Sequence, residues 1–394
     1  MQRPDYVDNS IVNLMASISA ALGGRNPDYS PLAYLSQDEI RSYKKVMLLV
    51  IDGLGHDTLL QANPGGFLAR HTRARITSVC PTTTASALTV FSSGKAPLQH
   101  GLTGWFSYFR ELGSITAVLP FIARHGGLPY DQQNISLDSI LGWSSVFNTL
   151  QCPTYTLLPR YIYDSHFSQQ TSGSAVRLGY DDFNDCLSQA QGLLHHNVQP
   201  IYLYAYWSEL DRLGHAHGIN SQQVSQHLAE LDQAIEQFAN HLPTDTLLLI
   251  TADHGQLDSS EDKTILLEDH PPLAECMTMP LSGEPRLAYC YVHTDKQHQF
   301  TNYIQQHLSH CCTVFSREEM LAQNLFGLGQ PHPELEHRIG DYALVMKENY
   351  IIRDIIAGER PFTMVGVHGG LSDAELFVPL VVWPPSHHSV VSLE

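Results

Sequence analysis

The sequence predicts an α/β protein with a doubly wound, mostly parallel central sheet flanked by helices. Three uninterrupted apolar runs indicate buried strands, namely Val46–Ile51, Ile201–Tyr206 and Thr246–Ile250. Continuous hydrophobicity, in place of alternation, is typical of strands that helices cover on both faces. Helical stretches lie between these runs, and strands that alternate with helices favour a doubly wound sheet.

The first and last elements follow from the same patterns. The stretch Ile11–Leu22 is apolar but interrupted by Asn and Ser, which predicts an amphipathic first helix and not a signal peptide. The clearest helix is Ser221–His241, whose apolar residues recur at spacings of three and four: Val224, Leu228, Leu231, Ile235 and Phe238. A fourth apolar run, Leu376–Trp383, predicts a strand near the end of the sequence.

Polar residues, glycines and prolines are frequent between the third and fourth of these strands, from about residue 256 to 361. This segment contains its own helical and strand-like pieces. We therefore expect residues 259–361 to form a smaller inserted cap domain, and residues 1–258 and 362–394 to form the larger core. A second excursion, at about residues 106–199, has no pattern that predicts its structure.

The composition is that of a globular protein that does not bind nucleic-acid polymers. Apolar residues make up 43% and charged residues 16% of the 394 residues, as in an ordinary folded domain. The formal net charge of −18 opposes binding to nucleic acids, because their affinity depends on Lys and Arg. A small phosphorylated substrate is still compatible with this charge. Its site would need concentrated positive charge, which bound metal ions supply efficiently.

The cysteines and the hydropathy predict a soluble, cytoplasmic protein without a membrane partner. Seven cysteines form an odd set that has no CxxC spacing and includes the adjacent pair Cys311 and Cys312. Such a set is typical of a reducing compartment and not of a disulfide framework. No apolar run reaches the length of about 18 residues that spans a bilayer.

Residue types that bind metals follow three of the predicted strands. Asp52 comes directly after the first, Asp211 and His215 follow the second, and Asp253 and His254 follow the third. Open α/β sheets bind ligands at the carboxyl ends of their strands, so these residues should converge. Asp and His are ligands that zinc prefers, and the spacing of four places two of them on one face if that turn is helical. A single Asp after a strand is usually a helix cap, but three such strand ends are hard to attribute to capping.

A candidate nucleophile lies among the hydroxyl residues after Pro81. A hydroxyl at the start of a helix gains from the helix dipole and from free N–H groups, which also bind anions. A nearby metal ion would lower the pKa of such a hydroxyl and make it a usable nucleophile. The alternative is a run of helix-capping residues. These arguments do not choose among Thr82, Thr83, Thr84 and Ser86.

The order and spacing of these motifs resemble the alkaline phosphatase superfamily, and within it the type I phosphodiesterase/nucleotide pyrophosphatase family. The resemblance covers the blocks 46–55, 77–101, 202–218, 247–255 and 367–380. It implies an alkaline-phosphatase-like catalytic core with an inserted cap. It also implies an enzyme, a two-metal hydrolase of phosphate diesters or pyrophosphate bonds in a small substrate, which is nucleotide-linked in part of the family. The expected intermediate is a phosphorylated or nucleotidylated threonine.

The resemblance also assigns roles to individual residues. It implies two divalent metal ions, expected to be zinc, held by six side chains: Asp52, Asp253 and His254 for one ion, and Asp211, His215 and His368 for the other. The family pattern P-T-x-T falls on the four residues Pro81 to Thr84, so Thr84 is expected to attack phosphorus. By contrast, His56 and His217 are expected to lie outside the ligand set.

One departure from the family leaves alternatives open. The family usually has an asparagine a few residues after the His-Gly of the nucleophile helix, where it contacts a phosphate oxygen. Here His100 and Gly101 are followed by Leu-Thr-Gly-Trp105. A phosphomonoesterase or phosphonate hydrolase with the same two-metal chemistry is therefore an alternative. A mutase that uses serine and manganese, and a catalytically silent binding protein, are further alternatives within the same fold. We expect Trp105 to pack in the core; the other possibility is that it stacks on a substrate ring.

Overall fold

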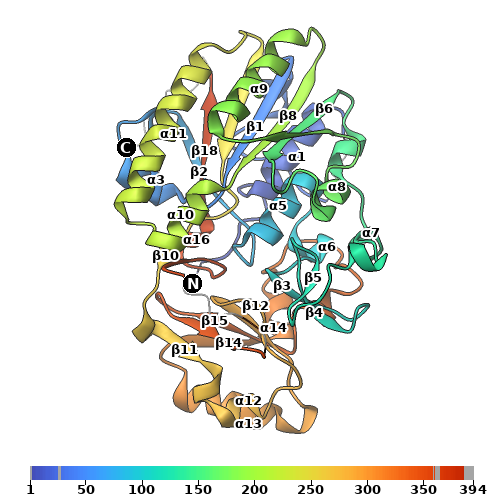
Figure 1. Ribbon diagram of the computed structural model, residues 1–394, viewed down its shortest axis with the longest axis vertical. Helices are drawn as coiled ribbons and strands as arrows, with labels where there is room; N and C mark the ends of the chain where they lie inside the picture. Colours follow the sequence, from blue (N-terminus) through green and yellow to red (C-terminus); the bar gives the residue numbers. More distant parts are fainter. Residues whose placement is uncertain (1, 25–27, 358, 360–363, 386–394) are drawn as a thin grey trace.

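The computed structural model describes residues 2–24, 28–357, 359 and 364–385. Within these residues the central sheet has seven strands: β1 (Lys45–Ile51), β2 (Thr72–Thr77), β6 (Thr154–Pro159), β7 (Val176–Tyr180), β8 (Ile201–Trp207), β9 (Thr246–Thr251) and β18 (Phe377–Trp383). Their order across the sheet is β2-β18-β9-β1-β8-β6-β7 (Figure 1). The strands from β9 to β7 are parallel, and β18 is antiparallel to both of its neighbours. This sheet confirms the predicted α/β class.

The four apolar runs of the sequence form four neighbouring strands, β18, β9, β1 and β8. Every residue of β1 is buried, as expected for a strand that is covered on both faces. The register places Ile51 of β1 opposite Trp207 of β8, and Val50 opposite Thr251 of β9. The carboxyl ends of these three parallel strands therefore lie at one edge of the sheet, where the residues that follow them meet.

Helices cover both faces of the central sheet. Figure 1 shows α1 (Ile11–Ala21) and α5 (Thr84–Ser93) behind the sheet, and α9 (Phe183–His196) and α11 (Gln222–Asn240) in front of it. The apolar residues predicted for α11 are all buried, because they form the stripe that faces the sheet. The doubly wound arrangement therefore agrees with the sequence.

The prediction that the first helix is amphipathic, with one face in water, is wrong. All residues of α1 from Ile11 to Ser19 are buried. The following segment, including α2 (Gln37–Arg41), packs over the face that we expected to meet water. The polar residues of α1 are satisfied inside the protein: Ser17 Oγ, for example, donates a hydrogen bond to the Leu35 carbonyl oxygen at 3.0 Å. The prediction failed because an apolar stretch interrupted by Asn and Ser is compatible both with a surface helix and with a buried helix whose polar side chains are hydrogen-bonded.

A second sheet lies beside the edge of the first sheet at which the parallel strands end, in the lower part of Figure 1. Within the described residues its strands are β3 (Phe106–Phe109), β4 (Ser114–Ala117), β5 (Ile122–Ala123), β12 (Ser282–Glu284), β13 (Leu287–Cys290), β14 (Cys312–Ser316) and β15 (Tyr342–Met346), in the order β14-β15-β13-β12-β3-β4-β5. The pair Gly283 and Phe106 joins its two halves, which come from the two excursions of the sequence. The proposed cap boundary between residues 361 and 362, like residues 386–394 of the proposed core, lies outside the described residues.

The remaining strands have two or three residues each. Two pairs of strands connect loops near the site: β10 (Leu257–Asp258) with β17 (Gly366–Val367), and β11 (Thr264–Leu266) with β16 (Ile351–Arg353). The other helices are α3 (His56–Ala62), α4 (Phe67–Arg70), α6 (Pro97–His100), α7 (Asp138–Leu141), α8 (His166–Thr171), α10 (Glu209–His217), α12 (Pro271–Ala274), α13 (Gln297–His307), α14 (Arg317–Ala322), α15 (Leu335–Arg338) and α16 (Asp373–Leu376). None of the helices in the described part of the chain has the length and hydropathy needed to cross a bilayer.

A buried ion pair connects the two sheets. Arg286, between β12 and β13, donates two hydrogen bonds to Glu375 of α16, from Nε to Oε1 at 3.1 Å and from Nη2 to Oε2 at 2.8 Å. Burial by itself raises the pKa of the Glu375 carboxyl, but the guanidinium and further hydrogen bonds outweigh burial and lower it. The charged pair thus fixes the turn that leads into β18 against the second sheet.

Candidate metal centre and active site

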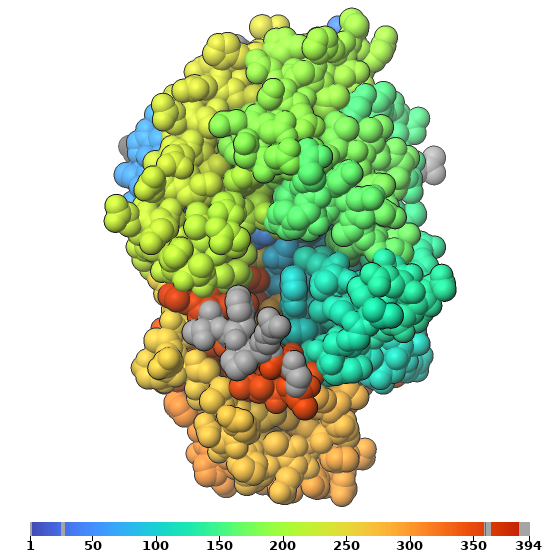
Figure 2. Space-filling model, viewed as in Figure 1, coloured from blue at the N-terminus to red at the C-terminus, as the bar shows by residue number. Residues whose placement is uncertain are grey.

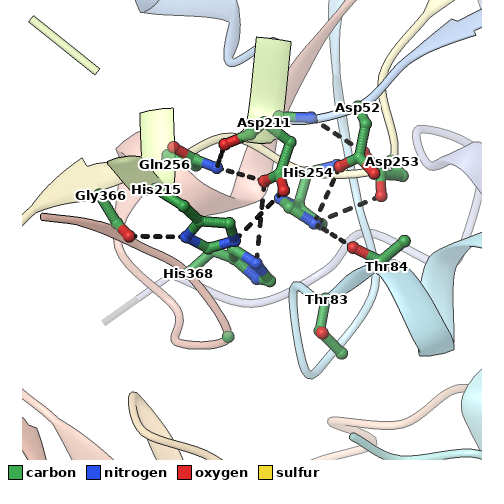
Figure 3. A network of polar contacts seen from close by, with 12 residues as sticks. Asp52, Thr83, Thr84, Asp211, His215, Asp253, His254, Gln256, Gly366 and His368 are labelled. Atoms are coloured by element: carbon green, nitrogen blue, oxygen red, sulfur yellow. Dashed lines mark hydrogen bonds and ion pairs between the residues drawn. The ribbon is translucent and has the colours of Figure 1, made fainter. Parts of the chain in front are cut away.

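The residues that follow β1 and β9 form the first of two ligand groups. The metal-binding atoms of Asp52, Asp253 and His254 all lie within 4.8 Å of one another, and all three side chains are buried (Figure 3). His254 Nε2 is 3.3 Å from Asp253 Oδ2 and 3.5 Å from Asp52 Oδ1. The parallel register of the two strands explains this proximity, because it places their ends side by side.

The second ligand group combines a helix with the loop before α16. Asp211 and His215 both lie on α10, so their spacing of four does place them on one helix face, as predicted. His215 Nε2 is 3.2 Å from Asp211 Oδ2, and His368 Nε2 is 3.9 Å from Asp211 Oδ1. The rings of His254 and His368 stack with centroids 3.8 Å apart, so the two groups adjoin. The structure therefore brings all six predicted ligand side chains together (Figure 3).

Backbone carbonyl groups orient the three imidazoles. Each ring uses Nδ1 to contact a carbonyl oxygen: Gly366 at 2.8 Å for His215, Thr82 at 3.0 Å for His368 and Gly255 at 3.0 Å for His254. A carbonyl only accepts hydrogen bonds, so Nδ1 carries a proton, and Nε2 is the nitrogen that can bind a metal ion. All three Nε2 atoms face the carboxylates. Protonation at Nδ1 with a carbonyl partner is the arrangement that suits metal binding through Nε2.

The carboxylates have the properties of cation ligands. Asp52 Oδ1 and Asp253 Oδ2 are buried and have no hydrogen-bond partner in the described part of the chain. Burial, and then the charge of Asp253, raise the pKa of Asp52 well above its ordinary value. Two ionised carboxylates at such a site require a positive charge between them. Oxygen and imidazole nitrogen are the donors that zinc and related divalent ions bind, so these residues fit the metal ions that the resemblance implies.

The hydroxyl of Thr84 lies next to the first ligand group. Thr84 is the first residue of α5, and its Oγ1 is 3.2 Å from His254 Nε2. The other three candidate hydroxyls donate to groups elsewhere: Thr82 to the Gly370 carbonyl oxygen at 2.8 Å, Thr83 to Glu284 Oε1 at 2.6 Å, and Ser86 to the Leu102 carbonyl oxygen at 2.9 Å. The geometry therefore favours Thr84 among the four hydroxyls that the sequence left open.

Several residues that support the ligands were not predicted. Tyr206 O–H donates a hydrogen bond to Asp52 Oδ2, and Gln256 Nε2 donates to Asp211 Oδ1. A tyrosine within an apolar strand is usually part of the core, so the sequence gives no indication of this role for Tyr206. The position of Gln256, two residues after His254, was the one available hint. The two histidines expected outside the ligand set do lie outside both groups: His56 contacts its neighbour Asp57 at 2.8 Å, and His217 is exposed.

A cavity of about 630 Å³ opens onto the site between the two sheets. Figure 2 shows this face hollowed between the green segment above and the teal and orange segments below. Blue atoms, which belong to the first quarter of the chain, are visible inside the hollow. Thr84, Asp211 and His368 line one end of the cavity, and mostly apolar side chains line the rest. Trp105 is 37% exposed and lines the cavity, so the prediction that it packs in the core is wrong.

Curated relatives share limited segments with this chain. The catalytic subunit of mouse GPI ethanolamine phosphate transferase 3 is 36% identical over 181 residues, and its human counterpart is 32% identical over 59 residues. These matches cover 38% and 15% of this chain, respectively. The chain spans only 16% of the mouse protein and 5% of the human protein.

Solved structures with the same fold include two enzymes of known type. Murine ectonucleotide pyrophosphatase/phosphodiesterase 5 has a TM-score of 0.65 and 17% identity, with 86% of this chain and 87% of that chain covered. An inactive variant of that murine protein has been solved in complex with AMP. Phosphonoacetate hydrolase from Sinorhizobium meliloti 1021, in complex with phosphonoformate, has a TM-score of 0.61 and 17% identity, covering 85% of this chain and 89% of that chain. These likenesses show the alkaline-phosphatase-like fold.

The sequence model of type I phosphodiesterase/nucleotide pyrophosphatase matches residues 129–371. This range includes more than half of the chain and five of the six predicted ligands, while Asp52 and Thr84 precede it. The match covers α10, the end of β9 and the loop that carries His368. The chain belongs to the type I phosphodiesterase/nucleotide pyrophosphatase family.

Proposed function

We propose that this protein is a metal-dependent hydrolase of phosphate diesters or pyrophosphate bonds in a small substrate, with Thr84 as its nucleophile. One observation carries the proposal: Thr84 Oγ1, at the N-terminus of α5, lies 3.2 Å from His254 Nε2 where the two ligand groups adjoin. Family membership supports the reaction class. The six ligands would hold two divalent ions, which we propose to be zinc.

The residues of the chain would divide the reaction into two displacements. Thr84 Oγ1 forms a bond to phosphorus, and the bond from phosphorus to the leaving oxygen breaks. The departing group leaves as an alcohol, or as a phosphate from a pyrophosphate. Water then cleaves the phosphorus–threonine bond and restores the hydroxyl. The free N–H groups at the start of α5 favour the charge on phosphate, and the metal ions, when bound, supply Lewis-acid stabilisation of charge on oxygen.

Two alternatives remain within the same fold. The position after Gly101 at which the family usually has an asparagine holds none, and a phosphonoacetate hydrolase has a similar fold, so a phosphonate or phosphomonoester substrate is the second candidate. A silent binding protein is less consistent with six candidate ligand side chains and a threonine hydroxyl beside them. Turnover measurements separate the three functions.

The test compares three aryl esters with zinc-loaded protein: bis-p-nitrophenyl phosphate, the p-nitrophenyl ester of a nucleoside monophosphate, and p-nitrophenyl phosphate. We expect one of the two diesters to be the best substrate. We also expect Thr84→Ala to lower kcat by at least about a thousandfold, with unchanged metal content. A strong preference for the monoester would reject the diesterase proposal, and substantial activity in Thr84→Ala would reject Thr84 as the nucleophile.

A further inference from the structure

Glu284 places a buried carboxylate in the cavity wall beside the nucleophile loop. It is the last residue of β12, only 7% exposed, and lines the same cavity as Thr83 and Thr84. Its Oε1 accepts two hydrogen bonds, from Thr83 Oγ1 at 2.6 Å and from the Trp105 backbone N–H at 2.5 Å. Figure 3 shows Thr83 and Thr84 close together where the chain enters α5. Glu284 is therefore fixed next to the residue that precedes the proposed nucleophile.

The second carboxylate oxygen of Glu284, Oε2, accepts neither of these two hydrogen bonds. Both hydrogen bonds end on Oε1, which leaves Oε2 available to the cavity that Glu284 lines. Within the described residues, no Lys or Arg forms an ion pair with Glu284. Two arginines also line the cavity, and neither forms an ion pair with Glu284 in the described part of the chain. Arg124 pairs with Asp354 and Glu359 at 2.7 Å each, and the charge of Glu359 also acts on Arg353. Near Thr84, the charge of Glu284 is therefore not balanced by an arginine or lysine.

A fixed negative charge at this position discriminates between phosphate groups. At about pH 8.5, where Glu284 is ionised, a phosphate diester carries one negative charge, whereas a monoester or a phosphonate carries nearly two. Repulsion by a carboxylate grows with the charge of the phosphate, and it is stronger in a buried site than in water. Such a repulsive group is a common way to exclude an unwanted ligand. The second organic group of a diester adds no charge, and the apolar part of the cavity has room for it.

We propose that Glu284 is a specificity-determining residue that makes the site prefer singly charged phosphodiesters to doubly charged monoesters and phosphonates. This inference rests on the proposed function, and it names the substrate class within it. It also gives a reason why a chain without the family asparagine could remain a diesterase. Discrimination would come from repulsion of the wrong substrate and not from an additional hydrogen bond to the right one.

The test is Glu284→Gln, which removes the charge but keeps the shape and an amide oxygen that can accept from Thr83 and Trp105. Burial raises the pKa of Glu284 to about 7, so the assays belong at about pH 8.5, where the carboxylate is ionised. The measurement is kcat/KM for bis-p-nitrophenyl phosphate and for p-nitrophenyl phosphate, which share one leaving group. We expect the ratio of monoester to diester activity to rise about tenfold or more in Glu284→Gln. Glu284→Asp keeps the charge, so its ratio should stay closer to that of the wild type.

An unchanged ratio in an active variant, including a partial and parallel loss of both activities, would overturn the inference and leave Glu284 a purely structural residue. If Glu284→Gln or the wild type is inactive, calorimetry with inorganic phosphate and zinc-loaded protein decides the question. Tighter binding of phosphate to the variant than to the wild type supports the inference, and equal or weaker binding overturns it. A wild type that binds two metal ions but hydrolyses neither ester would reject the proposed function. An active wild type with an unchanged ratio in the variant would reject the role of Glu284 alone.

Discussion

At the scale of single residues, the site depends on side chains that hold the predicted ligands in place. Asp52 has one oxygen that is buried without a hydrogen bond, and another that accepts from Tyr206 O–H. The hydroxyl thus fixes the carboxylate so that its free oxygen faces His254. Partners of this kind typically change metal affinity by one to two orders of magnitude when they are removed.

Tyr206→Phe should therefore weaken metal binding at the first ligand group by about tenfold, with a smaller effect on folding. Tyr202→Phe is the matched control, because Tyr202 lies on the same strand and its buried hydroxyl has no hydrogen-bond partner among the described residues. Zinc affinity measured by competition with a chelator checks both variants. Equal zinc affinities in Tyr206→Phe, Tyr202→Phe and the wild type would show that the hydroxyl does not support the site.

The sequence predicted the site residues whose type is unusual in its context, and it missed those whose type is ordinary there. Five of the six candidate ligands were predictable because Asp and His are unusual after apolar strands, whereas His368, which precedes the last strand, was predicted only from the family resemblance. Tyr206 and Gln256 are ordinary residue types within a strand and a loop. Glu284 belongs to a different sheet, and its position beside Thr83 follows only from the folded chain.

At the scale of elements, α10 is the part of the fold on which the second ligand group depends most. Gly214 lies within this helix, where alanine would normally be favoured by about 1 kcal/mol. A Cβ atom at this position would lie 2.0 Å from Gln256 Oε1 and 2.9 Å from its Cδ. Gln256 is the residue that holds Asp211. The glycine therefore allows the glutamine to approach the helix and position the ligand.

Gly214→Ala should weaken metal binding at the second ligand group by about tenfold, although it improves helix propensity. The control is Gly192→Ala in α9, where a Cβ would meet no atom within 4 Å, so this variant should be neutral or slightly stabilising. Metal content after dialysis and the midpoint of urea unfolding report the two effects separately. A Gly214→Ala protein that keeps its full metal content would refute the role given to Gln256.

Prediction at the level of elements worked where the pattern was long and regular. The buried strands and α11 were predicted within one or two residues, because continuous apolar runs and a three-to-four spacing are compatible with few other structures. By contrast, the sequence did not predict the first three strands of the second sheet. β3, β4 and β5 have four residues or fewer, and β3 reaches the sheet through a pairing with Gly283 that is far away in the sequence.

At the scale of the whole molecule, the fold brings seven side chains from positions 52 to 368 to one edge of the central sheet. The chain has a net charge of −18, and the site itself gathers three aspartates. An anionic substrate would be repelled from such a place without bound cations. The second sheet encloses the cavity, and the Arg286–Glu375 pair fixes it against the loop that leads back to β18. The central claim is therefore that two metal ions turn this acidic edge into a phosphate site.

The most direct test of that claim is the metal content of zinc-loaded, dialysed protein, measured by mass spectrometry for the wild type and for Asp211→Ala. We expect about two ions per chain in the wild type and about one in the variant, since Asp211 is the carboxylate of the second ligand group. A wild type that binds no zinc, or a variant with the same content as the wild type, would contradict the account.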